Sequence, residues 1–248
     1  MTTVSTGKQN PLAAAEAADK KRKMAIQIGV AAVLVALVAA IGIGIAVNRD
    51  DSGSGSAAQL PATGGSVTET GTVRIGNPDA KVKVRVVADL QCPACKQFEA
   101  ANGAALAQAT ADGTAVVEYQ IISFLDKAST NQYSSRAANA SFCVAKSDPS
   151  KYQNWLQTMF EKQPAEGGAG LSNEELIQIA TDAGYTDPAV ATCITDKPYA
   201  DYITQVTQQT LNSGVKSTPS VFVNGQLNQT DAIFTENGLA SVIADAAK

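Results

Sequence analysis

The chain has 248 residues, four cysteines, no histidine and a formal net charge of −4. The absence of histidine excludes Ser-His-Asp and Cys-His catalysis, and it excludes zinc sites built on imidazole. The first 23 residues carry a formal charge of +3 and the remainder carries −7, so the acidic body argues against a nucleic-acid partner.

A long apolar segment follows a basic cluster near the N-terminus. Between residues 24 and 47 the only polar side chain is Gln27, and a helix of this length reaches roughly 34 Å, enough to cross a hydrocarbon core of about 30 Å. A cleaved signal peptide is the alternative, but the apolar run is longer than the usual h-region and no A-x-A site follows directly. Because Lys20–Lys23 precede the run and acidic residues follow it, the positive-inside rule predicts a cytoplasmic segment 1–23, a single transmembrane helix 24–47 and an extracytoplasmic remainder at the cell membrane.

Beyond this segment, residues 48–72 are rich in Gly, Ser, Ala and Thr, which predicts a flexible linker. The expected elements after the linker, in chain order, are strands at 73–76 and 81–90, a helix from Pro93 to about Thr110, a strand at Ala115–Phe124, several helices between Ser129 and Asn212, a hairpin turning at Asn224–Gly225, and a helix from about Glu236 to Ala246. This order predicts that residues 73–248 fold as a thioredoxin-type α/β domain with a helical insertion at 129–212.

The motif "CPAC" contains two cysteines, Cys92 and Cys95, at the predicted start of a helix. Cysteines with this spacing can close a small disulfide, and the helix start favours a thiolate on the first sulfur. This predicts that Cys92 exchanges disulfides with a substrate and that Cys95, one turn further, displaces the substrate. Half of a four-cysteine zinc site is an alternative, but the sequence has no second CxxC motif. A permanently closed structural disulfide is the other alternative.

Two stretches, "NPDAKVKVRVVADLQCPACKQFE" and "KSTPSVFVNG", resemble the DsbA-like thiol-disulfide oxidoreductases, especially the membrane-anchored secreted branch of Gram-positive bacteria. The resemblance covers roughly residues 73–247. It implies that Pro219 is cis and lies against the active disulfide, with the Thr218 backbone available to pair with an extended substrate. Pro93 and Ala94, between the two cysteines, are expected to support the same site.

This chain differs from many strongly oxidising relatives at Ala94, where they carry histidine. The resemblance therefore implies a disulfide exchange enzyme more firmly than an extreme oxidant. Because the helix start remains, we expect the pKa of Cys92 to lie between about 3.5 and about 7.

Two acidic residues near the motif allow weaker predictions. Asp89 lies three positions before Cys92 and is expected to cap or solvate the end of the strand. Glu118 lies within an apolar strand. As a partly buried carboxylate it could relay the Cys95 proton, and as an exposed charge on an edge strand it would have no such role.

The other two cysteines, Cys143 and Cys193, both fall in the predicted helical block. With the CPAC cysteines paired to each other, one pairing remains for them. An extracytoplasmic location favours a structural disulfide over two buried free thiols. Trp155, Met159 and Phe160 share one predicted helix and are assigned to the core rather than to a peptide-binding groove.

Three functions remain in competition. The first is an enzyme that introduces disulfides into exported proteins and is reoxidised by a membrane quinone-linked partner of the DsbB or VKOR-like type, as the resemblance implies. The second is a reductase or isomerase on the same fold. The third is a non-catalytic sensor or binding domain, against which the two CPAC cysteines and the Thr-Pro pair argue. In all three, no metal and no cofactor beyond the Cys92–Cys95 disulfide is expected.

Overall fold

The computed structural model describes residues 67, 68 and 70–248. The predicted cytoplasmic segment 1–23, the predicted transmembrane helix 24–47 and most of the predicted linker 48–72 lie outside these residues. Among the described helices, none has both the length and the apolar composition needed to cross a bilayer.

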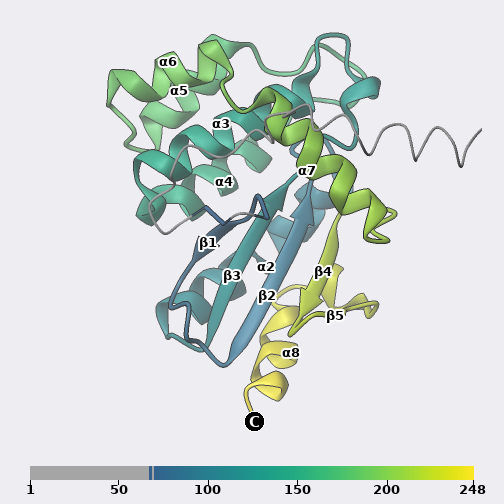
Figure 1. Ribbon diagram of the computed structural model, residues 1–248. Coiled ribbons are helices and arrows are strands. Elements are labelled where there is room, and N and C mark those ends of the chain that lie inside the picture. Colours follow the sequence, from purple (N-terminus) through teal and green to yellow (C-terminus); the bar gives the residue numbers. More distant parts are fainter. Residues whose placement is uncertain (1–66, 69) are drawn as a thin grey trace, which may run out of the picture. The chain divides into compact units, whose positions relative to one another are not determined.

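A mixed five-stranded sheet forms the centre of the described domain, with the strand order β1-β3-β2-β4-β5 (Figure 1). β2 and β3 pair in parallel, and the other neighbours pair antiparallel. Every residue of β3 is buried, as expected for an inner strand with both faces covered. The strands are β1 (Val73–Ile75), β2 (Val82–Ala88), β3 (Ala115–Ile121), β4 (Ser220–Val223) and β5 (Gln226–Leu227).

Helices cover the sheet on both faces. α2 (Pro93–Ala111) lies behind the sheet in Figure 1 and packs against β3 and against α8 (Gly238–Ala246). α7 (Ala200–Asn212) crosses the opposite face, where Thr207 and Thr210 bond to the end of β3 and the residues that follow it. This arrangement is the thioredoxin-like α/β fold predicted from the sequence.

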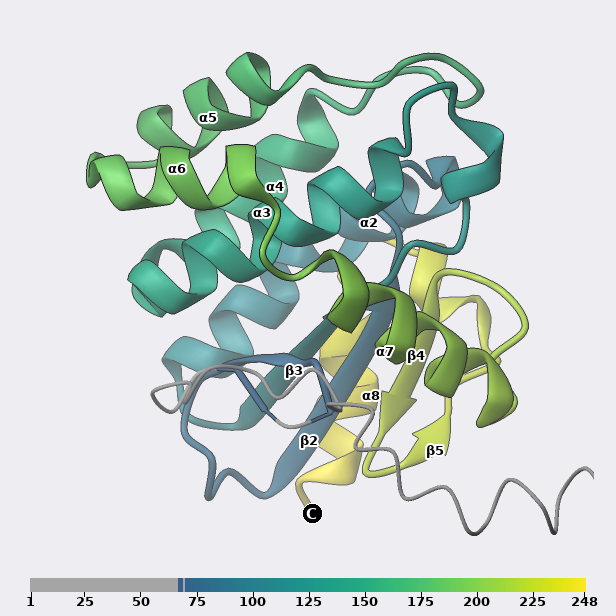
Figure 2. The same cartoon turned by 45° about the horizontal axis from the view of Figure 1, so that its top comes forward.

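The helical insertion lies at the carboxyl ends of β2 and β3 (Figures 1 and 2). Its core contains the fully buried Trp155 and Met159, with Phe160 beside them, so their assignment to the core is confirmed. Ser172 and Glu175 form a capping box at the start of α5, as the sequence pattern indicates. The helices of the insertion before α7 are α3 (Tyr133–Ser147), α4 (Tyr152–Glu161), α5 (Asn173–Asp182) and α6 (Pro188–Asp196).

Several element boundaries differ from the predictions by a few residues, and three of them have a local reason. The strand β3 ends at Ile121 rather than Phe124, because the chain turns outward and Phe124 is exposed. The helical block begins at Tyr133, after Gln132 adopts a left-handed φ of 58°. The last helix begins at Gly238, after Asn237 with a φ of 53°, since a left-handed residue interrupts helical hydrogen bonding.

Candidate active site

The end of β2 and the start of α2 bring the two CPAC cysteines together. Cys92 is the N-cap residue of α2, and Pro93 occupies the first helical turn, where its missing N–H costs no hydrogen bond. The Cys92 carbonyl accepts bonds from the N–H groups of Cys95 (3.0 Å) and Lys96 (3.2 Å). The first sulfur therefore lies at a helix N-terminus, where unpaired backbone N–H groups stabilise negative charge.

Both cysteines are free thiols in the structure, and their exposure differs. Cys92 retains 7% of its surface and Cys95 retains none. The Cys92 thiol donates to the Thr218 carbonyl at 3.3 Å, and the Thr218–Pro219 peptide bond is cis. Because β4 pairs antiparallel with β2, the segment leading into β4 meets the segment leaving β2 at one end of the sheet.

The two thiols have opposite pKa shifts. The hydrogen bond from Cys95 lowers the pKa of Cys92 to about 6, with help from Thr218 and from the N–H groups of Cys95 and Ala94 and against the opposing effect of burial. Burial raises the pKa of Cys95 well above its ordinary value, and the bond to Cys92 and the negative charge of Cys92 raise it further. One sulfur is thus suited to be a thiolate, and the other to hold a proton.

The Thr218 hydroxyl contributes to this site although Ala94 has no donor to offer. It is buried and makes no hydrogen bond of good geometry within the described chain, yet it lies close enough to both sulfurs to lower the pKa of each.

Sequence reasoning missed a buried polar network around the CPAC loop. Asp89 is completely buried and accepts three hydrogen bonds, rather than being solvated at the end of the strand. Gln163, just after α4, donates to the carbonyls of Leu90 and Cys92, each at 3.0 Å. The position of Asp89 before the motif was a usable signal, but nothing in the sequence around Gln163 indicates its role.

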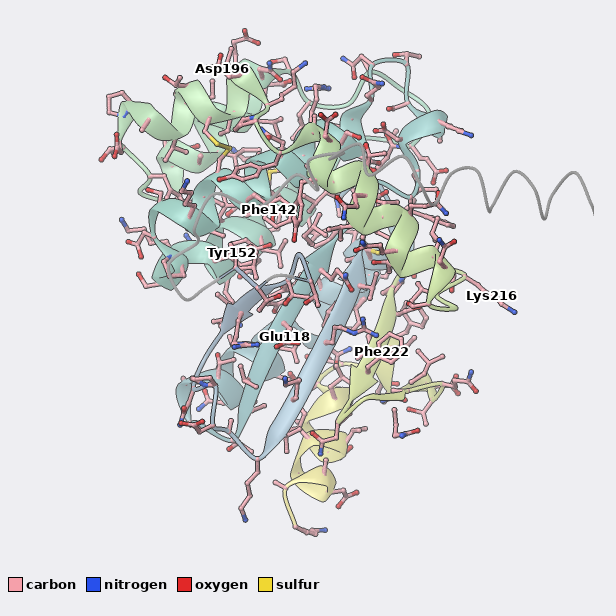
Figure 3. The ribbon with its side chains drawn as sticks, in the orientation of Figure 1. Glu118, Phe142, Tyr152, Asp196, Lys216 and Phe222 are labelled. Carbon is pink, nitrogen blue, oxygen red and sulfur yellow. A yellow bond between two sulfur atoms is a disulfide. The ribbon has the colours of Figure 1, made fainter. Side chains whose placement is uncertain are left out.

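Glu118 is buried in the inner strand β3, which contradicts one of the two alternatives considered for it. β3 lies between β1 and β2, so Glu118 is not an exposed charge on an edge strand. Its Oε1 pairs with Arg74 at 2.8 Å and with Lys83 at 3.5 Å, on the sheet face where Figure 3 labels it. Among the described residues it makes no hydrogen bond or ion pair with either CPAC cysteine. The structure gives the proton-relay prediction no support.

The second cysteine pair lies in the helical insertion. A disulfide joins Cys143 of α3 to Cys193 of α6 across 50 positions of sequence. Asn139 braces it by donating to the Cys193 carbonyl at 3.1 Å and by accepting from the Tyr199 N–H at 3.2 Å. The bond fastens two helices of the insertion to each other.

The described residues contain no group of three or more His, Cys, Asp or Glu side chains placed to hold a metal ion. Cys143 and Cys193 are bonded to each other and are not available to complete a four-cysteine site with the CPAC pair.

Curated relatives match part of the chain. The serine/threonine-protein kinase PknE of Mycobacterium tuberculosis is 32% identical over 143 residues, which are 56% of this chain and 25% of the kinase. The chain thus spans about a quarter of the length of the curated relatives it matches. The likeness is to one portion of PknE, and no kinase activity follows from it.

Two solved structures are matched by this chain over nearly the whole of their own length. DsbA from Mycobacterium tuberculosis, in its reduced form, is 30% identical with a TM-score of 0.58, covering 71% of this chain and 98% of that one. The disulfide bond oxidoreductase DsbG from the same organism is 29% identical with a TM-score of 0.60, covering 71% and 92%. A sequence profile of a family described as "Thioredoxin" matches residues 68–242. The chain therefore belongs to the DsbA-like thiol-disulfide oxidoreductases, enzymes of the thioredoxin family.

Proposed function

We propose that this chain introduces disulfides into exported proteins by donating its Cys92–Cys95 disulfide. The observation that carries this direction is the separation of the two pKa values, with that of Cys92 lowered to about 6 and that of Cys95 raised. Stabilising a thiolate stabilises the reduced enzyme, and a disulfide whose reduced form is stabilised is a stronger oxidant.

The exchange takes place in two displacements. A substrate thiolate attacks Cys92 Sγ of the oxidised pair, the Cys92–Cys95 bond breaks, and Cys95 leaves and takes a proton because its pKa is high. A second substrate thiolate then attacks the substrate sulfur of the mixed disulfide, and Cys92 leaves as a stable thiolate. The substrate loses two electrons and the enzyme gains them.

Thr218 supplies the second part of the site. Its carbonyl faces Cys92 Sγ at 3.3 Å, next to the position that a substrate sulfur must reach. An extended substrate segment can pair with this backbone as an added strand would. The site would thus bind the substrate main chain beside the reacting sulfur, with little dependence on substrate sequence.

The proposed location is outside the cell membrane, with segment 1–23 in the cytoplasm and 24–47 as a single anchor. The basic cluster and the apolar run support this topology, and a structural disulfide suits an oxidising compartment. Reoxidation of the reduced pair would fall to a membrane quinone-linked enzyme of the DsbB or VKOR-like type. Protease added to intact spheroplasts should digest the domain and spare the N-terminus, and protection of the domain would contradict this topology.

The direction of the reaction is tested by the reduction potential of the full-length chain in detergent, equilibrated with glutathione. An oxidase should lie nearer the value of about −120 mV known for DsbA than the value of about −270 mV known for thioredoxin. The same protein should reoxidise reduced ribonuclease in stoichiometric amounts. A potential near the thioredoxin value would favour the reductase or isomerase function.

The assignment of Cys92 as the exchanging sulfur is tested by a trap. Replacing Cys95 with alanine removes the enzyme thiol that can attack Cys92 of a mixed disulfide and release the bound substrate, so Cys95→Ala should accumulate mixed disulfides on Cys92 with exported proteins. The double variant Cys92→Ser/Cys95→Ala is the matched control and should accumulate none. Equal trapping by both variants would show that another cysteine carries the exchange.

A further inference from the structure

Asp89 lies between the last residue of β2 and the CPAC motif, and none of its surface is exposed. Its carbonyl accepts the N–H of Cys92 at 3.0 Å. The exchanging cysteine is therefore attached to Asp89 by a main-chain bond as well as by the chain itself. Acidic residues are rarely buried completely unless they are paired, and so the contacts of this side chain require an explanation.

Three donors from three segments meet at the Asp89 carboxylate. Oδ1 accepts from the Gln91 N–H at 2.8 Å and from the Ser134 hydroxyl of α3 at 2.8 Å. Oδ2 accepts from the Leu125 N–H, after β3, at 2.8 Å. Gln91 reinforces the junction because its amide donates to the Leu125 carbonyl at 2.9 Å. One side chain thus joins the CPAC loop, the loop after β3 and the first helix of the insertion.

This donor set fits a carboxylate and no neutral side chain of the same size. Both oxygens of Asp89 accept, whereas an asparagine would present an N–H₂ group to one of the three donors. The short distances are typical of bonds to a charged acceptor. The junction therefore holds its full set of bonds when Asp89 is ionised.

The ionised carboxylate lies within the electrostatic reach of the reactive sulfur. Burial raises the pKa of Asp89 to about 6, its three donors oppose the rise, and the charge of Cys92 adds to it. Two negative charges repel each other, so an ionised Asp89 would in turn disfavour the Cys92 thiolate. The elements packed around Asp89 carry other titratable and charged groups, among them Cys92, Cys95, Asp126, Tyr133 and Arg136.

None of the described residues forms an ion pair with Asp89. Arg136 of α3 bonds to oxygens of Asn131 and Leu171 and to others nearby, all away from the carboxylate. Asp126 accepts from the N–H and the hydroxyl of Ser135. The Tyr133 hydroxyl is buried without a hydrogen bond in the described chain, and Asp89 is among the causes that raise the pKa of Tyr133, after burial.

We propose that Asp89 is a positioning residue for disulfide exchange, whose carboxylate fixes the CPAC loop to the helical insertion and whose charge limits the stability of the Cys92 thiolate. The inference rests on the proposed exchange at Cys92. It adds that Asp89, the residue that holds the site together, also limits the oxidising strength of the Cys92–Cys95 disulfide. A purely structural cap would stabilise the fold and leave the titration of the thiol unchanged.

The first test compares Asp89→Asn and Asp89→Ala with Asp126→Asn in the full-length chain. Asp126 is a matched control, because it is a nearby carboxylate that accepts an N–H and a hydroxyl of the same helix. Thiolate absorbance against pH should show the acid dissociation constant of Cys92 rising at least threefold in both Asp89 variants and remaining unchanged in Asp126→Asn. The reduction potential should likewise rise in both Asp89 variants and remain unchanged in Asp126→Asn. A folded Asp89→Asn with an unchanged or weaker thiol acid would overturn the proposal.

A second measurement needs no variant to fold. The carboxyl carbon of Asp89 can be titrated by NMR in the wild-type chain in the reduced and in the oxidised state. Oxidation removes the thiolate, so the Asp89 midpoint should fall on oxidation, and equal midpoints in the two states would overturn the proposal. Because no substrate takes part, a chain that reduces substrates instead of oxidising them would still show the shift. Failure of the proposed function is thereby distinguished from failure of this inference.

Discussion

The two cysteine pairs of this chain have the same sulfur chemistry available to them, but the groups around the sulfur atoms differ in almost every respect. Cys92 and Cys95 lie one turn apart at a helix start, with the Thr218 carbonyl 3.3 Å from Cys92 Sγ and with pKa values displaced in opposite directions. Cys143 and Cys193 lie 50 positions apart, in the helical insertion where Figure 3 draws a disulfide between α3 and α6. The surroundings, rather than the sulfur atoms, assign one pair to exchange and the other to structure.

The largest expected effect separates the pairs by activity. Cys92→Ser should abolish ribonuclease oxidation, a loss of at least about a thousandfold, because the serine hydroxyl forms no disulfide. The double variant Cys143→Ser/Cys193→Ser should keep activity within a few fold under conditions where it is folded. Stopped assays with quantified thiols measure both. Activity retained by Cys92→Ser, or lost in the folded double variant, would reverse the assignment.

The next effect is on stability and falls on the other pair. A disulfide closing a loop of 50 residues lowers the conformational entropy of the unfolded chain. In the chain-entropy treatment this raises the free energy of unfolding by about 4 kcal/mol. Cys143→Ser/Cys193→Ser should therefore lower the free energy of unfolding by roughly that amount in urea titrations. The control in the same assay is serine replacement of the CPAC pair, because the Cys92–Cys95 disulfide closes only a very small loop. A smaller loss in the insertion variant than in the control would contradict the structural role.

A third effect concerns pH, and it acts through Glu99. This residue lies one turn beyond Cys95 in α2, is 8% exposed, and burial raises its pKa to about 7. The folded pKa exceeds the unfolded one, so the stability linked to Glu99 is present below about pH 4.5 and is lost as the pH rises through about 7. By contrast, the acidic residue of α6, Asp196, is exposed.

Glu99→Gln should abolish this loss. At pH 8 the variant should be more stable than the wild type by an amount on the order of 3 kcal/mol, and at pH 5 the difference should shrink. Urea unfolding of the oxidised protein at both pH values measures this without interference from the Cys92 thiol. Glu161→Gln, an exposed change in α4, is the control and should alter stability by less than about 0.5 kcal/mol. Equal stability of Glu99→Gln and wild type at pH 8 would show that Glu99 is ionised without cost.

The sequence predicts the exchange pair better than its surroundings, for a physical reason. A buried strand, a CPAC motif and a Thr-Pro pair are local patterns, and local patterns determine helix starts and turns. The Asn224–Gly225 turn has φ values of 48° and 82°, as its sequence requires. Burial of a charge depends instead on which distant segments meet.

Asp89 and Glu118 illustrate the limit. The donors that reach Asp89 from Leu125 and Ser134 lie 36 and 45 positions away, and the Arg74 partner of Glu118 lies 44 positions before it. No periodicity in the sequence relates such positions. From the sequence alone, Glu99 resembles an ordinary surface charge on a helix. In the fold, α4 packs against α2 and Glu99 is buried. Sequence patterns therefore identify where the sulfurs lie, while the fold determines what titrates beside them.

The smallest expected effect sharpens the contrast at Ala94, which is half-buried and offers no side-chain donor beside Cys92. A histidine at this position can donate to the thiolate, so Ala94→His should lower the pKa of Cys92 below about 6 and raise the reduction potential. A shift of one pKa unit is about 1.36 kcal/mol and corresponds to roughly 30 mV for this two-electron couple. Thiolate absorbance against pH and equilibration with glutathione measure the two quantities independently.

The pH dependence of the Ala94→His effect identifies its cause. An imidazolium stabilises the thiolate more than a neutral imidazole does, so the gain in potential should be larger at pH 6 than at pH 8.5. The Cys143–Cys193 disulfide, remote in sequence and locked in the insertion, should keep its resistance to reduction in the variant at both pH values. A potential that falls, or a gain that grows with pH, would mean that the added ring displaces the Thr218 carbonyl or hydroxyl from the sulfurs. In that case the existing contacts of Thr218, rather than the helix start, would set the acidity of Cys92.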